Sequence, residues 1–106
     1  MQQKTKELST CVRELRKNGT SLAEAERDYK IKLREWALRL KADGLAVGLI
    51  NTTIYGIPEV AELRFKRDVC KTVYEANQEA INSIKLQLRL LDNQIGREWS
   101  SPQAGM

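Results

Sequence analysis

The sequence predicts an all-α protein: a long antiparallel two-helix hairpin, coiled-coil-like, with an apolar glycine-rich central loop. Three observations predict this fold. Apolar residues recur at helical spacing on both sides of the midpoint. Three of the six glycines and one of the two prolines lie between these periodic stretches. The 106 residues are 30% charged and 6% aromatic, which is typical of long helices. We expect one domain at residues 1–99 and a flexible tail at 100–106.

The first helix is predicted over residues 5–43. One apolar stripe recurs every three or four residues, and it consists of Leu22, Ala25, Tyr29, Leu33, Trp36 and Leu40. Gly44 follows the last periodic turn, where helices commonly end. The stretch before Asn18-Gly19 continues the same face, which leaves two interpretations. Either one long helix crosses a weak point at Gly19, or a second helix begins near Ser21, with Glu24 completing a capping box.

The second helix is predicted over residues 58–98, because Pro58 suits the first turn of a helix. From residue 81 to residue 95 its heptad positions carry only Ile or Leu; these are Ile81, Ile84, Leu88, Leu91 and Ile95. Both helices have apolar faces broader than a single neighbour covers. We therefore expect a homo-oligomer, a four-helix or larger bundle, with these five residues as its seam. Arg67 and Asn77 interrupt the heptads and would set the register.

Residues 44–57 form the predicted loop, which is longer than most connections between bundle helices. It holds six large apolar side chains, namely Leu45, Val47, Leu49, Ile50, Ile54 and Tyr55. Two interpretations stay open. The loop folds back and caps the end of the bundle, or these side chains bind a partner. A hairpin closed by this loop would place Asp43 near Pro58.

The composition argues against catalysis. The chain has no histidine, the commonest general base near neutral pH and the commonest metal ligand. Cys11 and Cys70 form no CxxC motif, so zinc and thioredoxin-like chemistry are not indicated. We expect a protein that is not an enzyme, that uses no metal or cofactor, and that carries both cysteines reduced. No apolar run reaches the length of a membrane span, so a cytoplasmic location is expected.

Basic residues give the chain a net charge of +4. Those that the hairpin would bring toward the loop end are candidates for contact with an anionic partner; they are Arg39, Lys41, Arg64, Arg67 and Lys71. Acidic residues such as Glu62 and Asp68 are interleaved with them. The partner could therefore be a nucleic acid, a nucleotide or an acidic protein.

Residues 22–100 resemble small helical proteins encoded by phages and prophages of Gram-positive bacteria. The resemblance lies in "AERDY", "DGLAVGLI" and the run "AELRFKRDVCKTVYEANQEAINSIKLQLRLLDNQIGREWS". It implies a phage accessory role in the host cell, and it implies no particular chemistry. The leading hypothesis is an adaptor or inhibitor that binds a host or defence protein through its loop end. The alternatives are a nucleic-acid-binding factor in phage DNA replication or recombination, and an oligomer that sequesters a small anionic nucleotide.

Overall fold

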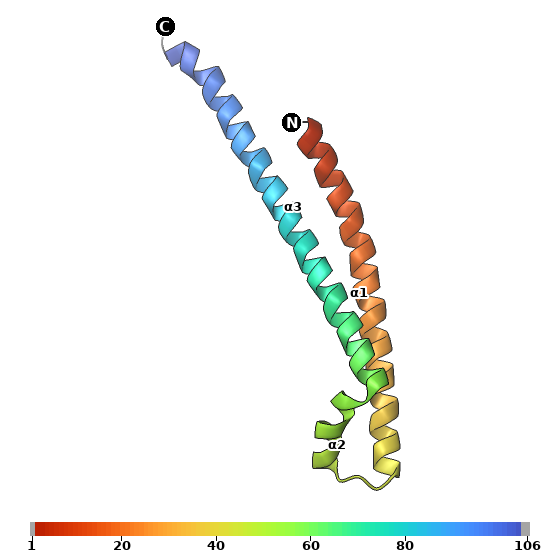
Figure 1. The fold of residues 1–106 in the computed structure, drawn as a ribbon. Coiled ribbons are helices and arrows are strands. Elements are labelled where there is room, and N and C mark those ends of the chain that lie inside the picture. Colours follow the sequence, from red (N-terminus) through yellow and green to blue (C-terminus); the bar gives the residue numbers. More distant parts are fainter. Residues whose placement is uncertain (1, 105–106) are drawn as a thin grey trace. The chain divides into compact units, whose positions relative to one another are not determined.

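The structure, a computed structural model, describes the backbone of residues 2–104 and the side chains of residues 2–97. Four helical elements follow one another (Figure 1): α1 (Gln2–Ala42), α2 (Val47–Thr53), the 3-10 helix η1 (Ile54–Gly56) and α3 (Pro58–Ala104). The described residues contain no strand, so the all-helical prediction is confirmed. The chain divides into two compact units. Unit 1 combines residues 1–16 with 75–106, and unit 2 is residues 17–74.

Helix α1 ends where its sequence predicts. Gly44 has a φ of 88°, in the left-handed region that glycine adopts without a steric penalty. Its N–H donates to the Lys41 carbonyl at 3.0 Å, and the Leu45 N–H donates to the Leu40 carbonyl at 3.1 Å. These two bonds form a Schellman motif, which satisfies carbonyls that the last turn would otherwise leave without donors.

Helix α1 is continuous across Asn18-Gly19. This resolves the two interpretations in favour of one long helix, and the predicted capping box at Ser21 is wrong, because no helix begins there. A Cβ added at Gly19 would lie 3.4 Å from Cε2 of Tyr74. The glycine therefore lets the Tyr74 ring lie directly against the α1 backbone, at the cost of weaker helix propensity.

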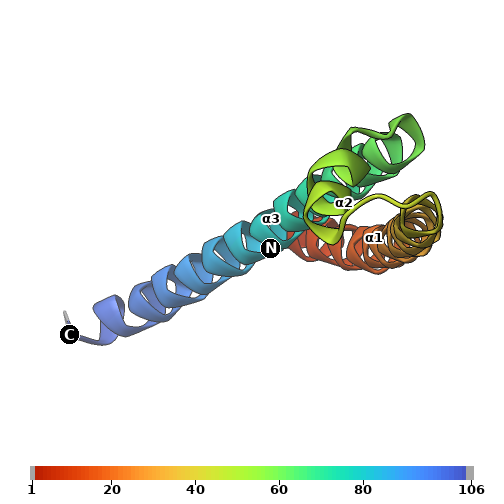
Figure 2. The same cartoon turned by 90° about the horizontal axis from the view of Figure 1, so that it is seen from below.

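The predicted loop is mostly helical. Helix α2 and η1 occupy residues 47–56 and leave only short connections on each side. In Figure 1 this segment lies beside the end of α1, and Figure 2 shows the same end from below. The predicted loop at residues 44–57 thus contains two short helical elements that were not predicted from its sequence. A run without proline or charge, from Val47 to Tyr55, can form helical turns when its apolar side chains have a surface to cover.

Helix α3 begins at Pro58, as predicted. The Ile57 carbonyl accepts the first helical bond, from the Ala61 N–H at 2.8 Å. Its end differs from the prediction, because the helix continues past residue 98 to Ala104. Residues 100–104 of the predicted flexible tail therefore extend α3, and residues 105–106 lie outside the described part. A short polar stretch gives no apolar periodicity, yet it can prolong a helix that has already formed.

The core of unit 2 lies where α1, η1 and α3 meet. Tyr29, Ile54 and Val60 form a buried cluster. Partly buried apolar residues surround it, namely Leu33, Trp36, Ala37, Leu40, Ile57 and Leu63. The expected proximity of Asp43 to Pro58 is wrong, because Glu59 instead reaches Trp36. The last turns of α1 thus extend past the start of α3, and the α2–η1 segment packs beside them.

Unit 1 pairs the N-terminal turns of α1 with the later turns of α3. Ile81 and Ile84 are buried there. The Asn77 amide donates to the Cys11 carbonyl at 3.0 Å, so this predicted polar seam residue joins the two helices of one chain. Of the predicted oligomer seam, Leu88 and Leu91 are half-buried and Ile95 is exposed. Ile81 and Ile84 pack inside the chain. For Leu88, Leu91 and Ile95, a seam with another copy stays a prediction.

Candidate functional site: the loop end

The six apolar residues of segment 44–57 divide into two groups. Ile50 and Ile54 are buried, with 8% and 4% of their surfaces exposed, and Leu45 is half-buried. Ile54 belongs to the core cluster of unit 2. These residues anchor the segment to the hairpin. Their side chains are covered by the chain itself, so the contact with a partner predicted for Ile50 and Ile54 has no exposed surface here and stays a prediction.

The other three apolar side chains remain open to solvent. Val47 is 71% exposed, Leu49 56% and Tyr55 45%. Large apolar side chains are usually buried in folded proteins, although single exposed ones are common. Here three occur within nine residues on a segment held in place by its own buried neighbours. We call Val47, Leu49 and Tyr55, together with Arg64, the loop-end residues.

Arg64 joins this group through Tyr55. Its guanidinium carbon lies 5.0 Å from the centre of the Tyr55 ring, within the range of a cation–π contact. In the described part of the chain, no carboxylate lies within ion-pair distance of Arg64. The contact fixes the position of the charge and leaves its N–H groups for another acceptor.

A second polar cluster surrounds Trp36. Its indole N–H donates to Oε2 of Glu59 at 3.2 Å, and Nζ of Lys32 lies 3.6 Å from the same oxygen. Arg39 stacks over the indole ring at 4.4 Å. The Trp36 hydrogen bond is the main cause that lowers the pKa of Glu59; desolvation opposes it, and Lys32 and Arg39 act in the lowering direction. This cluster links α1 to the first turn of α3.

Lys32 also contacts Glu35, whose carboxylate lies 3.1 Å from Nζ. The hydrogen bond and charge of Glu35 raise the pKa of Lys32, with Glu59 adding to the effect. Sequence reasoning missed both Lys32 and Glu59 as partners of Trp36. The indole N–H of Trp36 could have indicated such a partner, since a half-buried Trp usually donates a hydrogen bond to an acceptor.

The five predicted anion-binding residues do not all gather into one cluster, although Arg64, Arg67 and Lys71 share one face of α3. Arg39 and Arg64 stack on different rings, and Arg67 stacks on Tyr29 at 4.8 Å. Arg67 also pairs with Asp68 at 2.8 Å, so its charge is already compensated. The other two, Lys41 and Lys71, are exposed. The arrangement favours separate contacts with single acidic groups over a concentrated basic patch.

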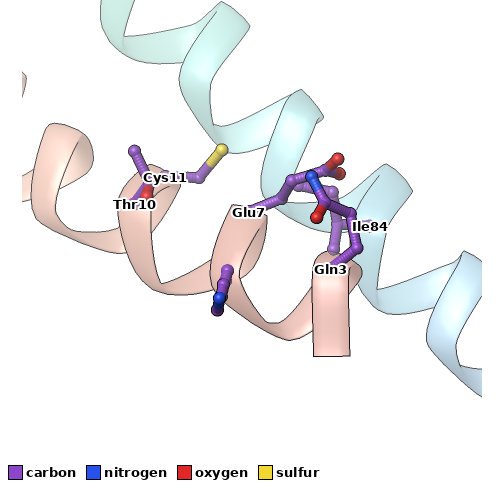
Figure 3. A pocket seen from close by; sticks show the side chains of 6 residues that line it. Gln3, Glu7, Thr10, Cys11 and Ile84 are labelled. Atoms are coloured by element: carbon purple, nitrogen blue, oxygen red, sulfur yellow. The ribbon is translucent and has the colours of Figure 1, made fainter. Parts of the chain in front are cut away.

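Unit 1 contains a shallow open groove of about 460 Å³. It is lined by Gln3, Lys6, Glu7, Thr10, Cys11 and Ile84. Figure 3 shows the Cys11 sulfur on the side of α1 that faces α3. Cys11 and Cys70 are both half-buried free thiols. The mixed lining, with Lys6 and Glu7 of opposite charge, indicates no particular class of ligand.

Within the described residues, no three acidic, cysteine or histidine side chains converge to hold a metal ion. None of the helices in that same part is long and apolar enough to cross a membrane. No family model matches the chain, and no curated protein or solved structure is detectably similar to it.

Proposed function

We propose that the protein is a non-enzymatic binding protein that contacts another protein through its loop-end residues. One observation carries the proposal: the α2–η1 segment separates anchoring from exposed apolar side chains. Ile50 of α2 and Ile54 of η1 are buried, while Val47 and Leu49 of α2 remain exposed. A rigid support with exposed apolar and aromatic side chains beside an arginine has the composition of a protein interface.

The partner follows from the resemblance to phage and prophage proteins. We propose a host or defence protein, with this chain acting on it as an adaptor or inhibitor in the cytoplasm of the host cell. Binding of a nucleic acid or a nucleotide is the alternative function, and the structure supports it less well. Both alternatives need several cations acting together, whereas Arg39, Arg64 and Arg67 each stack on a separate ring.

Site-specific cross-linking in the host tests the proposal. A photo-reactive amino acid at position 49 is expected to capture a defined protein. The same amino acid at position 31 is the matched control, because Ile31 is 52% exposed on α1 of the same unit. Equal capture from both positions, or none from position 49, would remove the loop end as the recognition surface.

A substitution series separates binding from folding. Val47→Asp is expected to abolish the capture while leaving helicity, measured by circular dichroism, unchanged, because this side chain is exposed. Ile50→Asp is expected to lower the free energy of unfolding, because it places a charge in a buried position. If Val47→Asp also unfolds the protein, the segment is structural and the proposal fails.

A further inference from the structure

We infer that the partner binds through an acidic helix. The carboxylates of this helix would bind Arg64 and Lys71 of α3. The inference rests on the proposed function and specifies the chemistry of the partner. It starts from the Tyr55–Arg64 contact at the loop end. A stacked guanidinium keeps its N–H edges available, and their fork geometry fits the two oxygens of a carboxylate.

Arg64 begins a row of three basic residues on one face of α3. Arg67 and Lys71 follow at spacings of three and seven residues, which place all three on the same side of a helix. The middle charge is compensated, because Arg67 pairs with Asp68 at 2.8 Å. Neither Arg64 nor Lys71 has a carboxylate within ion-pair distance among the described residues. The row therefore has two uncompensated charges with a neutralised one between them.

The spacing of these two charges matches a helical partner. Seven residues of helix rise about 10.5 Å, so Arg64 and Lys71 are separated by that distance along α3. A second helix aligned with α3 repeats the same rise. Acidic residues seven positions apart on it would face Arg64 and Lys71, while the position between them meets Arg67, which requires no further anion.

A nucleic acid fits this pattern less well. Its phosphates form a continuous row of charge and favour a continuous row of cations. Two uncompensated cations would give a salt dependence with a slope of only about −1.4 for a single strand. The exposed Val47 and Leu49 at the same end of unit 2 also have no role on a phosphate backbone. The observations thus favour an acidic, partly apolar peptide.

Binding of synthetic peptides to the full chain tests the inference. The probe is a fluorescein-labelled helical peptide of Ala and Leu with two Glu seven residues apart, measured by fluorescence anisotropy. Its matched control carries Gln at both positions. The Glu peptide is expected to bind the protein tighter by about five-fold or more. Equal binding of the two peptides would overturn the inference.

Protein variants assign the effect to individual residues. Arg64→Gln and Lys71→Gln are each expected to weaken binding of the Glu peptide by about two- to five-fold. Lys66→Gln removes the same charge from a different face of α3 and is expected to change nothing. An equal loss in all three variants would show an effect of net charge alone and would overturn the inference. If labelled oligothymidylate binds tighter than the Glu peptide, and Arg64→Gln abolishes that binding, the row binds nucleic acid and the inference is overturned.

Failure of this inference is distinguishable from failure of the proposed function. The cross-linker at position 49 is placed in the Arg64→Gln/Lys71→Gln double variant. Capture that persists unchanged would keep protein binding at the loop end and reject the acidic helix. Capture that falls with the peptide affinity supports the inference. If the cross-linker at position 49 captures nothing in the protein that retains Arg64 and Lys71, the proposed function is rejected, whether or not the peptides bind.

Discussion

Replacing Gly19 by alanine tests the long α1 helix at its weakest point. The substitution removes the helix penalty of glycine, which is about 1 kcal/mol in a helix interior. The new Cβ would lie 3.4 Å from Cε2 of Tyr74 and 3.9 Å from Cδ2. Both distances are close to ordinary van der Waals contact, so a shift of the ring by a few tenths of an ångström accommodates the methyl group. We expect Gly19→Ala to raise the free energy of unfolding by about 0.5–1 kcal/mol.

The assay is urea denaturation followed by circular dichroism, with the midpoint and slope compared between variants. Gly96→Ala is the matched control, because Gly96 lies inside α3 and a Cβ there meets nothing within 4 Å. It reports the propensity gain without a packing contact. A loss of about 1 kcal/mol in Gly19→Ala with a gain in Gly96→Ala would refute the reasoning. That result would indicate that Gly19 ends a helix in a left-handed conformation, as in the two-helix interpretation.

Three further predictions concern the loop end. Gly44→Ala forces a φ of 88° on a residue with a side chain and is expected to lower the unfolding free energy by about 1 kcal/mol; an unchanged urea midpoint would contradict the Schellman motif. Ile54→Ala is expected to cost about 2–4 kcal/mol, because the side chain is 4% exposed in the core cluster; a loss below about 1 kcal/mol in the same assay would show that the segment does not pack there. Glu59 has a folded pKa below its ordinary value of 4.5, so it stabilises the fold above that pH and loses this effect as the pH falls through the folded pKa. The difference in thermal midpoint between the wild type and Glu59→Gln should therefore shrink in acid, and a difference independent of pH would exclude the linkage.

Both long helices could be predicted because their signals are redundant. In α1 the apolar period and the glycine stop indicate the same end. In α3 Pro58 and the heptads agree on the start and the face. Each signal is local, so no knowledge of the partner helix is needed. The same locality explains why the capping box at Ser21 is wrong. Ser and Glu at this spacing also occur inside a continuous helix, so the pair alone does not mark a helix start.

The alignment of the two helices could not be predicted in the same way. It depends on how far α1 extends past the beginning of α3, and no local signal in either helix reports that distance. Glu59 reaches Trp36 and not the end of α1. The heptads overestimate the oligomer seam for a related reason, because Ile81 and Ile84 are buried within one chain. Heptad positions show that a face is apolar, and they do not say whether the neighbour belongs to the same chain.

The division of the loop into anchoring and exposed residues has a sequence signal that apolar content alone conceals. Ile50, Ile54 and Ile57 recur at spacings of four and three, which is the period of a helix with one buried side. Leu49 falls outside this stripe, and the structure leaves it exposed. The periodicity that defines the long helices thus continues through the central segment. It separates Leu49 from the buried Ile50 and Ile54, but it does not separate Val47, which lies three residues before Ile50 and is 71% exposed at the beginning of α2. For Leu49 and Ile50 it explains why charged substitutions should have opposite consequences for binding and folding.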